Sequence, residues 1–340
     1  MTTRAVIVDD TDDARIEYEG SSWLNYENTV TDFGRFGTPV GQTLHGTHTS
    51  GGISFVFTGT ATQVWGPNDL NTNVTWACSI DGNAISNGDV SVNAAILCSK
   101  DQLADKPHTL RLDAVVPDTD HIFWFDHIQY TPSLGESMEN ETIYIDSSDP
   151  WLDYGSGWSP MFDMGHTTEQ TGATFDFEFI GISLAWYTFI APSFSSNPTS
   201  ASYTIDGGTP VVLTVTGPSG MEVLSTSFNQ KLFQTPDLPM GRHKLSVVYH
   251  GNDHTAPLSL GYLVVQNGTG SIPDLSNADG VRTPKKRNVG AIVGGVLSGL
   301  VFIIVLVLGF RFIQKRKRQR QIRRHRKKYS NLERDMKFLR

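Results

Sequence analysis

The chain has 340 residues, of which 10% are aromatic and 18% are charged, and its formal net charge is −8. Before position 280, Gly, Ser, Thr, Asn and Asp recur about every ten residues, which is typical of turn-rich all-β chains and excludes long amphipathic helices there. The sequence has no Ser nucleophile elbow, zincin helix, phosphate loop or nucleotide fingerprint, so it predicts that the chain is not an enzyme.

Four short motifs occur twice, in the same order, between the N-terminus and residue 267. Each copy of the set spans about the length of one jelly-roll sandwich. The repeat therefore predicts an all-β region of two tandem jelly-roll β-sandwiches, residues 1–132 and 143–267. The paired motifs are Val8–Asp12 with Ile145–Asp149, Phe55–Gly59 with Phe177–Gly181, Ile80–Gly82 with Ile205–Gly207, and His108–Leu112 with His243–Val247.

Two features of the β region suit an oxidising compartment. Cys78 precedes a predicted Asp-Gly hairpin and Cys98 ends an apolar run, so we expect a disulfide between neighbouring strands or loops of the first domain. Two reduced, buried thiols are the alternative. Sequons that begin at Asn73, Asn140 and Asn267 predict N-glycosylation.

A transmembrane helix is predicted after the β region. Residues 268–288 read as a linker rich in Gly, Pro, Asn and Asp, and residues 289–310 are 22 uncharged residues rich in Val, Ile and Leu. At about 1.5 Å per residue they cover a hydrocarbon core of about 30 Å, and their uniform hydrophobicity argues against a buried helix of a soluble protein. Small residues on this helix predict that two copies pair through it: Gly290, Gly294, Gly295 and Gly299.

The basic residues of the tail predict the orientation. Residues 311–340 hold 14 Lys+Arg against 2 Asp+Glu, whereas residues 1–288 hold 13 against 33. By the positive-inside rule the tail is cytoplasmic and the β region faces outside or the lumen, in the plasma membrane or another secretory-pathway membrane. We expect the tail to contact anionic lipid rather than nucleic acid, because its basic cluster begins beside the helix. No signal peptide follows Met1, so a tail-anchored protein with a cytosolic β region is the competing topology.

Seven motifs of the first domain follow one another in the order Val8–Asp12, Gly34–Thr38, Leu44–Thr47, Phe55–Gly59, Ile80–Gly82, His108–Leu110 and Phe123–Tyr130. This order resembles that of a large, mostly uncharacterised set of fungal single-pass membrane proteins with tandem galactose-binding-like jelly rolls. The resemblance extends over nearly the whole chain but contains no catalytic motif. The second domain departs from it, with Gly261 where Asp126 would align and no copy of Gly34–Thr38.

The resemblance implies carbohydrate binding, in which aromatic faces in loops stack on sugar rings. Most aromatic residues of a sandwich belong to its core, so a core position is the alternative for each candidate. The candidates are Trp23, Tyr26, Trp65, Trp151 and Trp158.

The resemblance also implies a structural calcium ion between acids of the first and last strands, for which Asp9, Asp10 and Asp126 are the candidates. The sequence favours the alternative that these are solvated turn carboxylates that cap backbone amides. His45 and His48 lack a third metal ligand and are interpreted as exposed loop histidines.

These features predict a single-pass membrane protein that displays a carbohydrate-binding or adhesive ectodomain at the cell surface, with cell-wall or surface glycans as partners. One alternative is an enzyme acting on cell-wall polysaccharide, which requires two carboxylates that converge in one cleft. The other is a receptor-like sensor that signals through a partner bound to the tail.

Overall fold

The computed structural model describes residues 3–20, 22–27, 38–68, 73–87, 95–220 and 225–269, which belong to one compact unit, residues 1–277. The prediction of an all-β region is confirmed, because the described residues contain no α-helix; η2 (Val40–Gln42) is a short 3₁₀ turn. Two hydrophobic clusters fill the unit, one in residues 6–128 and one in residues 145–265. We call residues 3–132 the first half and residues 142–269 the second half. The domain boundaries predicted at 132 and 143 stay a prediction.

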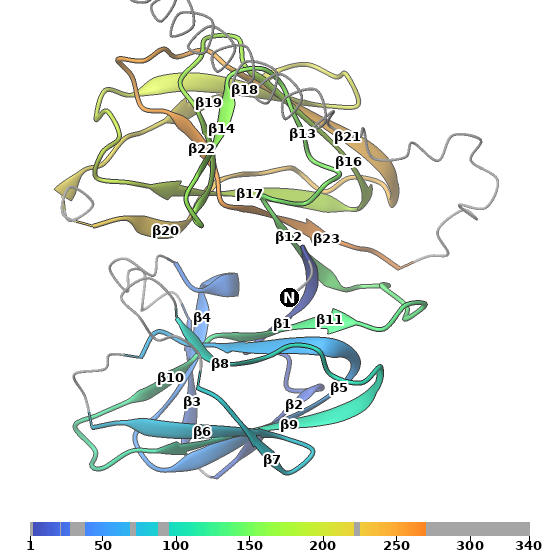
Figure 1. Ribbon diagram of the computed structural model, residues 1–340, viewed down its shortest axis with the longest axis vertical. Coiled ribbons are helices and arrows are strands. Elements are labelled where there is room, and N and C mark those ends of the chain that lie inside the picture. Colours follow the sequence, from blue (N-terminus) through green and yellow to red (C-terminus); the bar gives the residue numbers. More distant parts are fainter. Residues whose placement is uncertain are drawn as a thin grey trace, which may run out of the picture. The chain divides into compact units, whose positions relative to one another are not determined.

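The first half is a sandwich of two layers joined by one long strand, β5 (Figure 1). The first part of β5 pairs with β2 and β9, and its second part pairs with β8 and β11. Strands β3, β4 and β10 form a separate three-stranded sheet. The bounds are β1 (Arg4–Asp9), β2 (Ile16–Glu19), β3 (Trp23–Glu27), β4 (Thr43–Thr47), β5 (Gly51–Trp65), β6 (Thr75–Ile80), β7 (Asn83–Ile85), β8 (Ile96–Lys100), β9 (Lys106–Val115), β10 (Phe123–Phe125) and β11 (His127–Pro132).

The second half repeats this order of strands, with two strands, β16 and β17, in place of β5. Two of its sheets run β13-β16-β21-β18-β19 and β14-β15-β22, and its strands β12-β23-β17-β20 form one end of a 12-stranded sheet that continues through β1 into the first half. The bounds are β12 (Thr142–Asp146), β13 (Asp153–Tyr154), β14 (Trp158–Met161), β15 (Gly165–Thr168), β16 (Thr174–Gly181), β17 (Ser183–Ile190), β18 (Thr199–Ile205), β19 (Val211–Val215), β20 (Ser227–Gln234), β21 (Gly241–Tyr249), β22 (Leu258–Leu260) and β23 (Tyr262–Gln266).

The repeated motifs make the same contacts in both halves. His108 Nδ1 lies 2.8 Å from Asp81 Oδ2, and His243 Nδ1 lies 2.7 Å from Asp206 Oδ2. In each histidine Nε2 bonds the backbone carbonyl four residues earlier. Asp81 and Asp206 have φ of 52° and 53°, and the glycine after each also has positive φ. Left-handed conformation at both central residues is what a two-residue hairpin turn requires, as the Asp-Gly pairs predicted.

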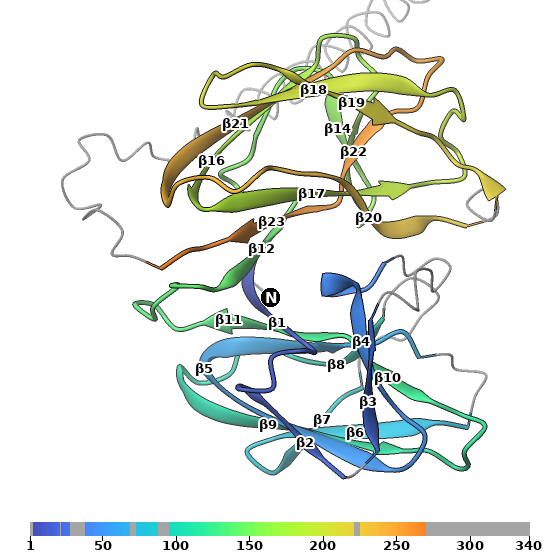
Figure 2. The same cartoon turned by 180° about the vertical axis from the view of Figure 1, so that it is seen from behind.

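Strands β1 and β12 occupy the same place in the two halves and pair with each other in antiparallel register (Figure 2). Val6 pairs with Ile143, and the offset between these two residues equals the offset between Val8 and Ile145 in the repeat. A residue that pairs with its own repeat equivalent marks an approximate two-fold axis. The two halves therefore meet as the subunits of an isologous dimer do.

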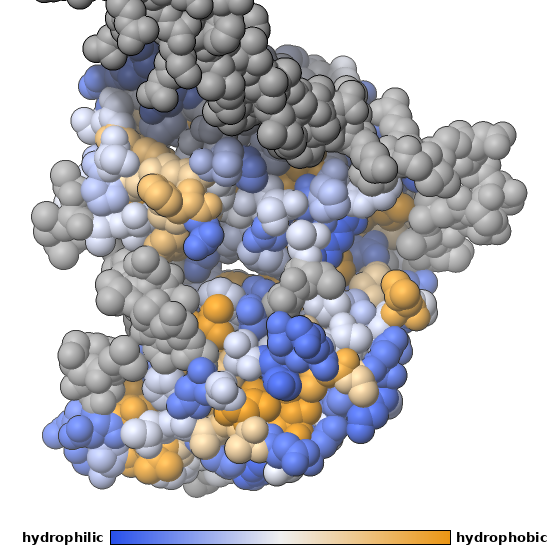
Figure 3. Space-filling view, in the orientation of Figure 1, coloured by the Kyte–Doolittle hydropathy of each residue, from blue (hydrophilic) through white to orange (hydrophobic). Residues whose placement is uncertain are grey.

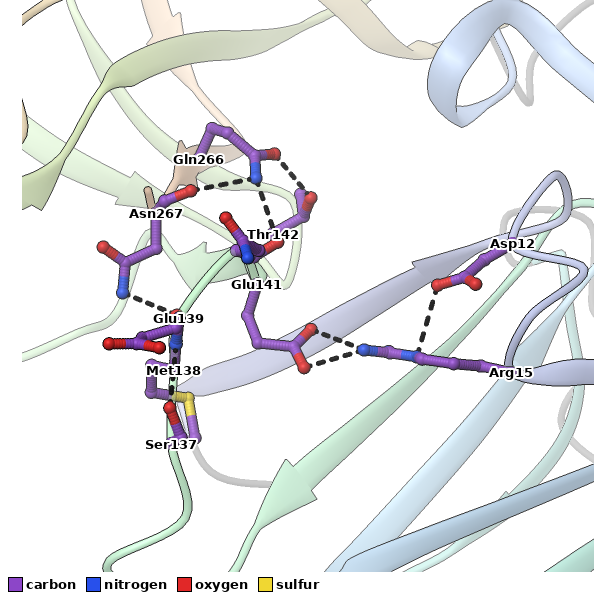
Figure 4. A network of polar contacts seen from close by, with 10 residues as sticks. Asp12, Arg15, Ser137, Met138, Glu139, Glu141, Thr142, Gln266 and Asn267 are labelled. Atoms are coloured by element: carbon purple, nitrogen blue, oxygen red, sulfur yellow. Dashed lines mark hydrogen bonds and ion pairs between the residues drawn. The ribbon is translucent and has the colours of Figure 1, made fainter. Parts of the chain in front are cut away.

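Ion pairs flank this strand pair. Arg4 donates two hydrogen bonds to Asp149, at 2.8 Å from Nε and 3.0 Å from Nη2, and the Asp149 side chain is 1% exposed. At the symmetry-related position the repeat has Glu141 in place of Arg4 and Asp12 in place of Asp149. Arg15 bridges these two acids, with Nη1 at 2.7 Å from Glu141 and Nε at 3.3 Å from Asp12 (Figure 4). Arg15 thus supplies the positive charge that is lost where Glu141 replaces the equivalent of Arg4.

The predicted disulfide is confirmed. Cys78 on β6 and Cys98 on β8 are bonded, with their Cα atoms 6.3 Å apart. These strands pair with different parts of the first half, β6 with β9 and β8 with the second part of β5, so the bond ties the two layers together. The second half contains no cysteine.

Nearly all of the predicted linker (268–288), the transmembrane helix (289–310) with Gly290, Gly294, Gly295 and Gly299, and the tail (311–340) lie outside the described residues. In the part of the chain that is described, no helix has the length and apolar character needed to span a bilayer.

Candidate functional site

A cleft of about 620 Å³ opens in the first half, where β2 meets residues of β3 and β4. Its volume is in the range of about 300–1,000 Å³ that is typical of small-molecule sites. We call it the Trp23 cleft. Its lining consists of Asp13, Ala14, Arg15, Ile16, Glu17, Tyr18, Gly20, Trp23 and His45.

Two aromatic rings form one wall of the Trp23 cleft. The centroids of Tyr18 and Trp23 lie 5.2 Å apart. Trp23 packs edge-on against the buried Phe123, and its Nε1 donates to the carbonyl oxygen of Glu19 at 3.1 Å. The indole N–H is therefore satisfied, and the half-buried ring is held in place with an apolar surface on the cleft.

His45 lies in the cleft with its ring fixed from two sides. Its Nδ1 is 2.8 Å from Oδ2 of Asp10, a fully buried carboxylate whose Oδ1 accepts from Thr43 at 2.6 Å. The Tyr18 ring stacks on the imidazole at 4.4 Å, and the Tyr18 hydroxyl donates to the Asp10 carbonyl oxygen at 2.6 Å. The interpretation of His45 as an exposed loop residue is wrong, because it sits in β4 and is 8% exposed.

The charged residues of the Trp23 cleft differ in whether they have ion-pair partners. Arg15 forms ion pairs with Glu141 and Asp12. Burial alone would lower the pKa of Arg15, but the hydrogen bond and the charge of Glu141 raise it. Asp13 and Glu17 are exposed, and among the described residues neither side chain has a hydrogen-bond or ion-pair partner. Two exposed acids are therefore among the residues that line the cleft.

The second half contains the same aromatic cluster with one difference. Tyr154 stacks on His166 at 4.3 Å, its hydroxyl donates to the Ser147 carbonyl oxygen at 2.7 Å, and Trp158 lies 5.4 Å from it. Ser147 stands where the first half has Asp10. At this position the first half thus has a carboxylate and the second half has a serine hydroxyl.

The three acids predicted to bind calcium do come together at one end of the first half. Burial raises the pKa of Asp9 to about 6, against the hydrogen bond from Thr11, and the charges of Asp10 and Asp126 add to this. Burial also raises the pKa of Asp126, whose Oδ1 accepts from the backbone N–H of Val40 at 3.0 Å.

The calcium site at these acids stays a prediction. Each carboxylate already accepts a hydrogen bond from a protein donor, and only Asp9 Oδ1 is buried with no partner in the described residues. Within those residues no group of three or more His, Cys, Asp or Glu side chains is arranged to hold a metal ion. The sequence's alternative of solvated turn carboxylates is wrong for Asp10 and Asp126, which are buried.

The other predicted sugar-contacting aromatics do not line the Trp23 cleft. Tyr26 packs edge-on against Trp124, and Trp65 stacks on His127 at 5.4 Å. Trp158 packs toward the second core and donates to the Thr174 carbonyl oxygen at 2.9 Å. Trp151 is 50% exposed.

The asparagines of the three sequons differ in their exposure to solvent. Asn73 and Asn140 are exposed. Asn267 is buried, and its side-chain nitrogen donates to the Met138 carbonyl oxygen at 2.6 Å (Figure 4). A glycan on Asn267 would require that this contact be broken, which disfavours glycosylation there.

Some of the described residues expose apolar side chains. Large exposed hydrophobic residues such as Val56 and Val212 are present, and on the face in Figure 3 a group of apolar residues in the lower part is bordered by hydrophilic ones. Single exposed apolar residues are normal on a soluble surface.

Sequence reasoning identified Trp23 and Asp10 separately but missed that His45 and Tyr18 join them. The signal was present in the repeat: a Tyr, a Trp and a His recur at matching places as Tyr154, Trp158 and His166. Residues kept in both copies at the same strand positions point to one shared cluster.

No family model matches the chain. It is 27% identical over 244 residues to an A type blood alpha-D-galactosamine galactosaminidase of Flavonifractor plautii, a match covering 69% of this chain and 20% of that protein. The chain thus spans about a fifth of the length of that relative.

Solved structures give weaker likenesses. A family two carbohydrate esterase from Cellvibrio japonicus matches with TM-score 0.29 and 19% identity, covering 38% of this chain and 34% of that one. The extracellular domain of ANXUR2 from Arabidopsis thaliana matches with TM-score 0.25 and 9% identity, covering 77% of this chain and 94% of that one. Scores this low carry no argument about function.

One prediction is corrected by these comparisons. The absence of a catalytic motif led to the expectation that the chain is not an enzyme. The curated relative is a galactosaminidase, and this finding overturns that expectation. Glycosidases act with two carboxylates at a set separation in space, and a short sequence motif does not encode that separation.

Proposed function

We propose that the chain is a glycoside-active protein and that the Trp23 cleft holds the sugar. The observation that carries the proposal is the cleft itself, in which the fixed ring of Trp23 lies beside polar groups that can bond hydroxyls. Sugar sites combine these two elements, since the C–H face of the ring stacks on an aromatic surface while its hydroxyls need hydrogen-bond partners.

Charge favours an amino sugar as the occupant. Asp13 and Glu17 are unpaired among the described residues, whereas Arg15 is neutralised by two acids. An ammonium group gains a Coulomb attraction from such carboxylates that a neutral hydroxyl or acetamide does not gain. The name of the curated relative, an alpha-D-galactosamine galactosaminidase, supports the same substrate class.

The test is isothermal titration of the full chain with methyl α-D-galactosaminide and with the neutral methyl α-D-galactoside. Each exposed ion pair contributes up to about 1 kcal/mol, so we expect the amino sugar to bind about threefold to tenfold more tightly at low salt. Glu17→Gln should reduce this preference, and Asp153→Asn, at the matching position of the second half, should not. Equal affinity for both sugars would contradict the choice of an amino sugar.

Hydrolysis in the same cleft is a second candidate. Asp13 and Glu17 line one cleft with Trp23, and glycosidases act with two carboxylates on either side of the scissile bond. We expect the full chain to release p-nitrophenol from p-nitrophenyl α-D-galactosaminide, and Asp13→Asn or Glu17→Gln to abolish the release. Tight binding of the sugar without any release would remove hydrolysis and leave recognition.

We propose, from the sequence, that this region is displayed outside the cell or in the lumen by the apolar segment 289–310. The charge difference across that segment and the exposed sequons Asn73 and Asn140 support the orientation. Deglycosylation of the expressed protein should increase its gel mobility. No shift, with the β region digested only in permeabilised cells, would contradict the orientation.

A further inference from the structure

We infer that His45, positioned by Asp10, accepts a hydrogen bond through Nε2 from a hydroxyl of the bound sugar, and that this makes the first half the sugar-binding half. The inference rests on the proposed sugar site in the Trp23 cleft. Three observations carry it: the contacts that fix the imidazole, its place in the cleft, and the serine that the second half has in place of Asp10.

The carboxylate of Asp10 decides which ring nitrogen carries the proton. Asp10 is fully buried, and its two oxygens face Thr43 Oγ1 at 2.6 Å and His45 Nδ1 at 2.8 Å. A carboxylate oxygen accepts hydrogen bonds, so Nδ1 of His45 is the donor. In the neutral imidazole Nε2 then keeps its lone pair and acts as an acceptor.

The ring is also held against rotation. His45 lies in the middle of β4, which pairs with β3 on one side and with β10 on the other. Tyr18 stacks on the imidazole at 4.4 Å, and its hydroxyl is fixed by the Asp10 carbonyl oxygen. A preorganised acceptor loses little conformational freedom when a ligand binds, which favours affinity.

Nε2 is the part of this residue that remains available to a ligand. His45 lines the Trp23 cleft, and among the described residues no hydrogen bond to its Nε2 is present. Sugar hydroxyls are donors, and a hydroxyl that meets an acceptor beside an aromatic face completes the usual pattern of sugar recognition. Asp10 therefore acts as a positioning residue and His45 as the contact residue.

The second half provides an internal comparison. It keeps the histidine, the tyrosine and the tryptophan but has Ser147 in place of Asp10. Ser147 cannot act on His166 as the Asp10 carboxylate acts on His45, because a serine side chain is a neutral hydroxyl. We expect the second half to bind the same sugar much more weakly or not at all.

The first measurement uses the wild-type full chain with ¹⁵N-labelled histidine. In the NMR spectrum Nδ1 of His45 should be protonated and Nε2 should carry a lone pair. The Nε2 signal should move when methyl α-D-galactosaminide is added, and that of His166 should not. A protonated Nε2, or an unchanged Nε2 signal at a sugar concentration that saturates binding, would overturn the inference.

The second measurement uses Asp10→Ser, which gives the first half the residue of the second. Loss of one well-oriented hydrogen bond should weaken sugar binding by about tenfold, and the ring nitrogens of His45 should shift away from the Nδ1-protonated form. His166→Phe is the matched control and should leave the affinity unchanged. A shifted tautomer with unchanged affinity would overturn the inference.

The outcomes separate this inference from the proposed function. If Trp23→Ala abolishes sugar binding and Asp10→Ser does not weaken it, the cleft binds the sugar and the role of His45 falls. If the wild-type chain binds no sugar, the proposed function and the role of His45 are both refuted. If Asp10→Ser does not fold, the spectrum of the wild-type chain can still refute the inference, because it needs no variant.

Discussion

Replacing Arg4 with methionine tests how much the buried ion pair stabilises the junction of the two halves. Arg4 is 44% exposed, but its partner Asp149 is 1% exposed and accepts both of its hydrogen bonds. Among the described residues, the donors that then remain to Asp149 are the Thr3 hydroxyl and the Trp151 N–H. A buried carboxylate that loses its cation costs several kcal/mol, reduced here because Arg4 is partly solvated, so we expect a loss of about 2–3 kcal/mol.

Arg111→Met is the matched control. The side chain of Arg111 is 40% exposed, a fraction similar to the 44% of Arg4. Its partners Glu19 and Asp113, however, are 42% and 54% exposed. An exposed ion pair contributes about 0–1 kcal/mol, so this variant should lose little. The two losses are compared by urea unfolding of the full chain at pH 7, followed by tryptophan fluorescence. Equal losses would show that burial of Asp149 does not give the pair its strength.

The pH dependence has a definite sign. Burial alone would raise the pKa of Asp149, but the hydrogen bonds from Arg4 lower it below its usual range. Since the folded pKa lies below the unfolded value of about 3.9, this stabilisation is fully present above that value and is lost as the pH falls through the folded pKa. The difference between wild type and Arg4→Met should therefore shrink in acid. A constant difference from pH 7 to pH 3 would refute the reasoning.

Three further predictions concern the halves themselves. Replacing Cys78 and Cys98 by serine removes a bond between residues 20 apart in sequence and should cost about 3 kcal/mol in urea unfolding; an unchanged midpoint would contradict the role of the bond in joining the layers. The backbone hydrogen bond from Thr109 and the side-chain hydrogen bond from His108 lower the pKa of Asp81 to about 2. Wild type should therefore lose stability as the pH falls from about 4 to 2, and Asp81→Asn should lose less. Identical changes in the melting curves of the two proteins over that range would contradict this. Trp186→Ala empties a fully buried position and should cost about 3–5 kcal/mol by the same unfolding assay, and a loss below about 1 kcal/mol would mean that the second core repacks.

Local patterns predicted the parts of the fold that depend on neighbouring residues. The Asp-Gly turns at Asp81 and Asp206 follow from the preference of these residues for positive φ, and the alternation at Phe55 and Phe57 follows from the pleat of a strand. The disulfide followed from two cysteines beside predicted strands, in a region expected to face an oxidising compartment. Each of these needs only a few residues of sequence context.

The remaining features depend on contacts between distant segments. The pairing of β1 with β12 joins Val6 to Ile143, and nothing in either strand alone says which edge it will meet. The same holds for His45, because Asp10 and Tyr18 reach it from other segments of the fold. A Gly/Thr-rich context suggested a loop there, and the pairing with β3 and β10 makes it a strand instead.

The most direct test of the sugar site is a titration of the full chain with methyl α-D-galactosaminide in which Trp23→Ala is compared with Trp158→Ala. Both tryptophans donate their indole N–H to a backbone carbonyl and pack beside a tyrosine, but only Trp23 lines the cleft. Loss of the aromatic wall should weaken binding by about tenfold or more in Trp23→Ala, and Trp158→Ala should stay within about twofold of wild type. Equal effects of the two substitutions, or no binding by the wild-type chain, would contradict the assignment of the Trp23 cleft as the sugar site.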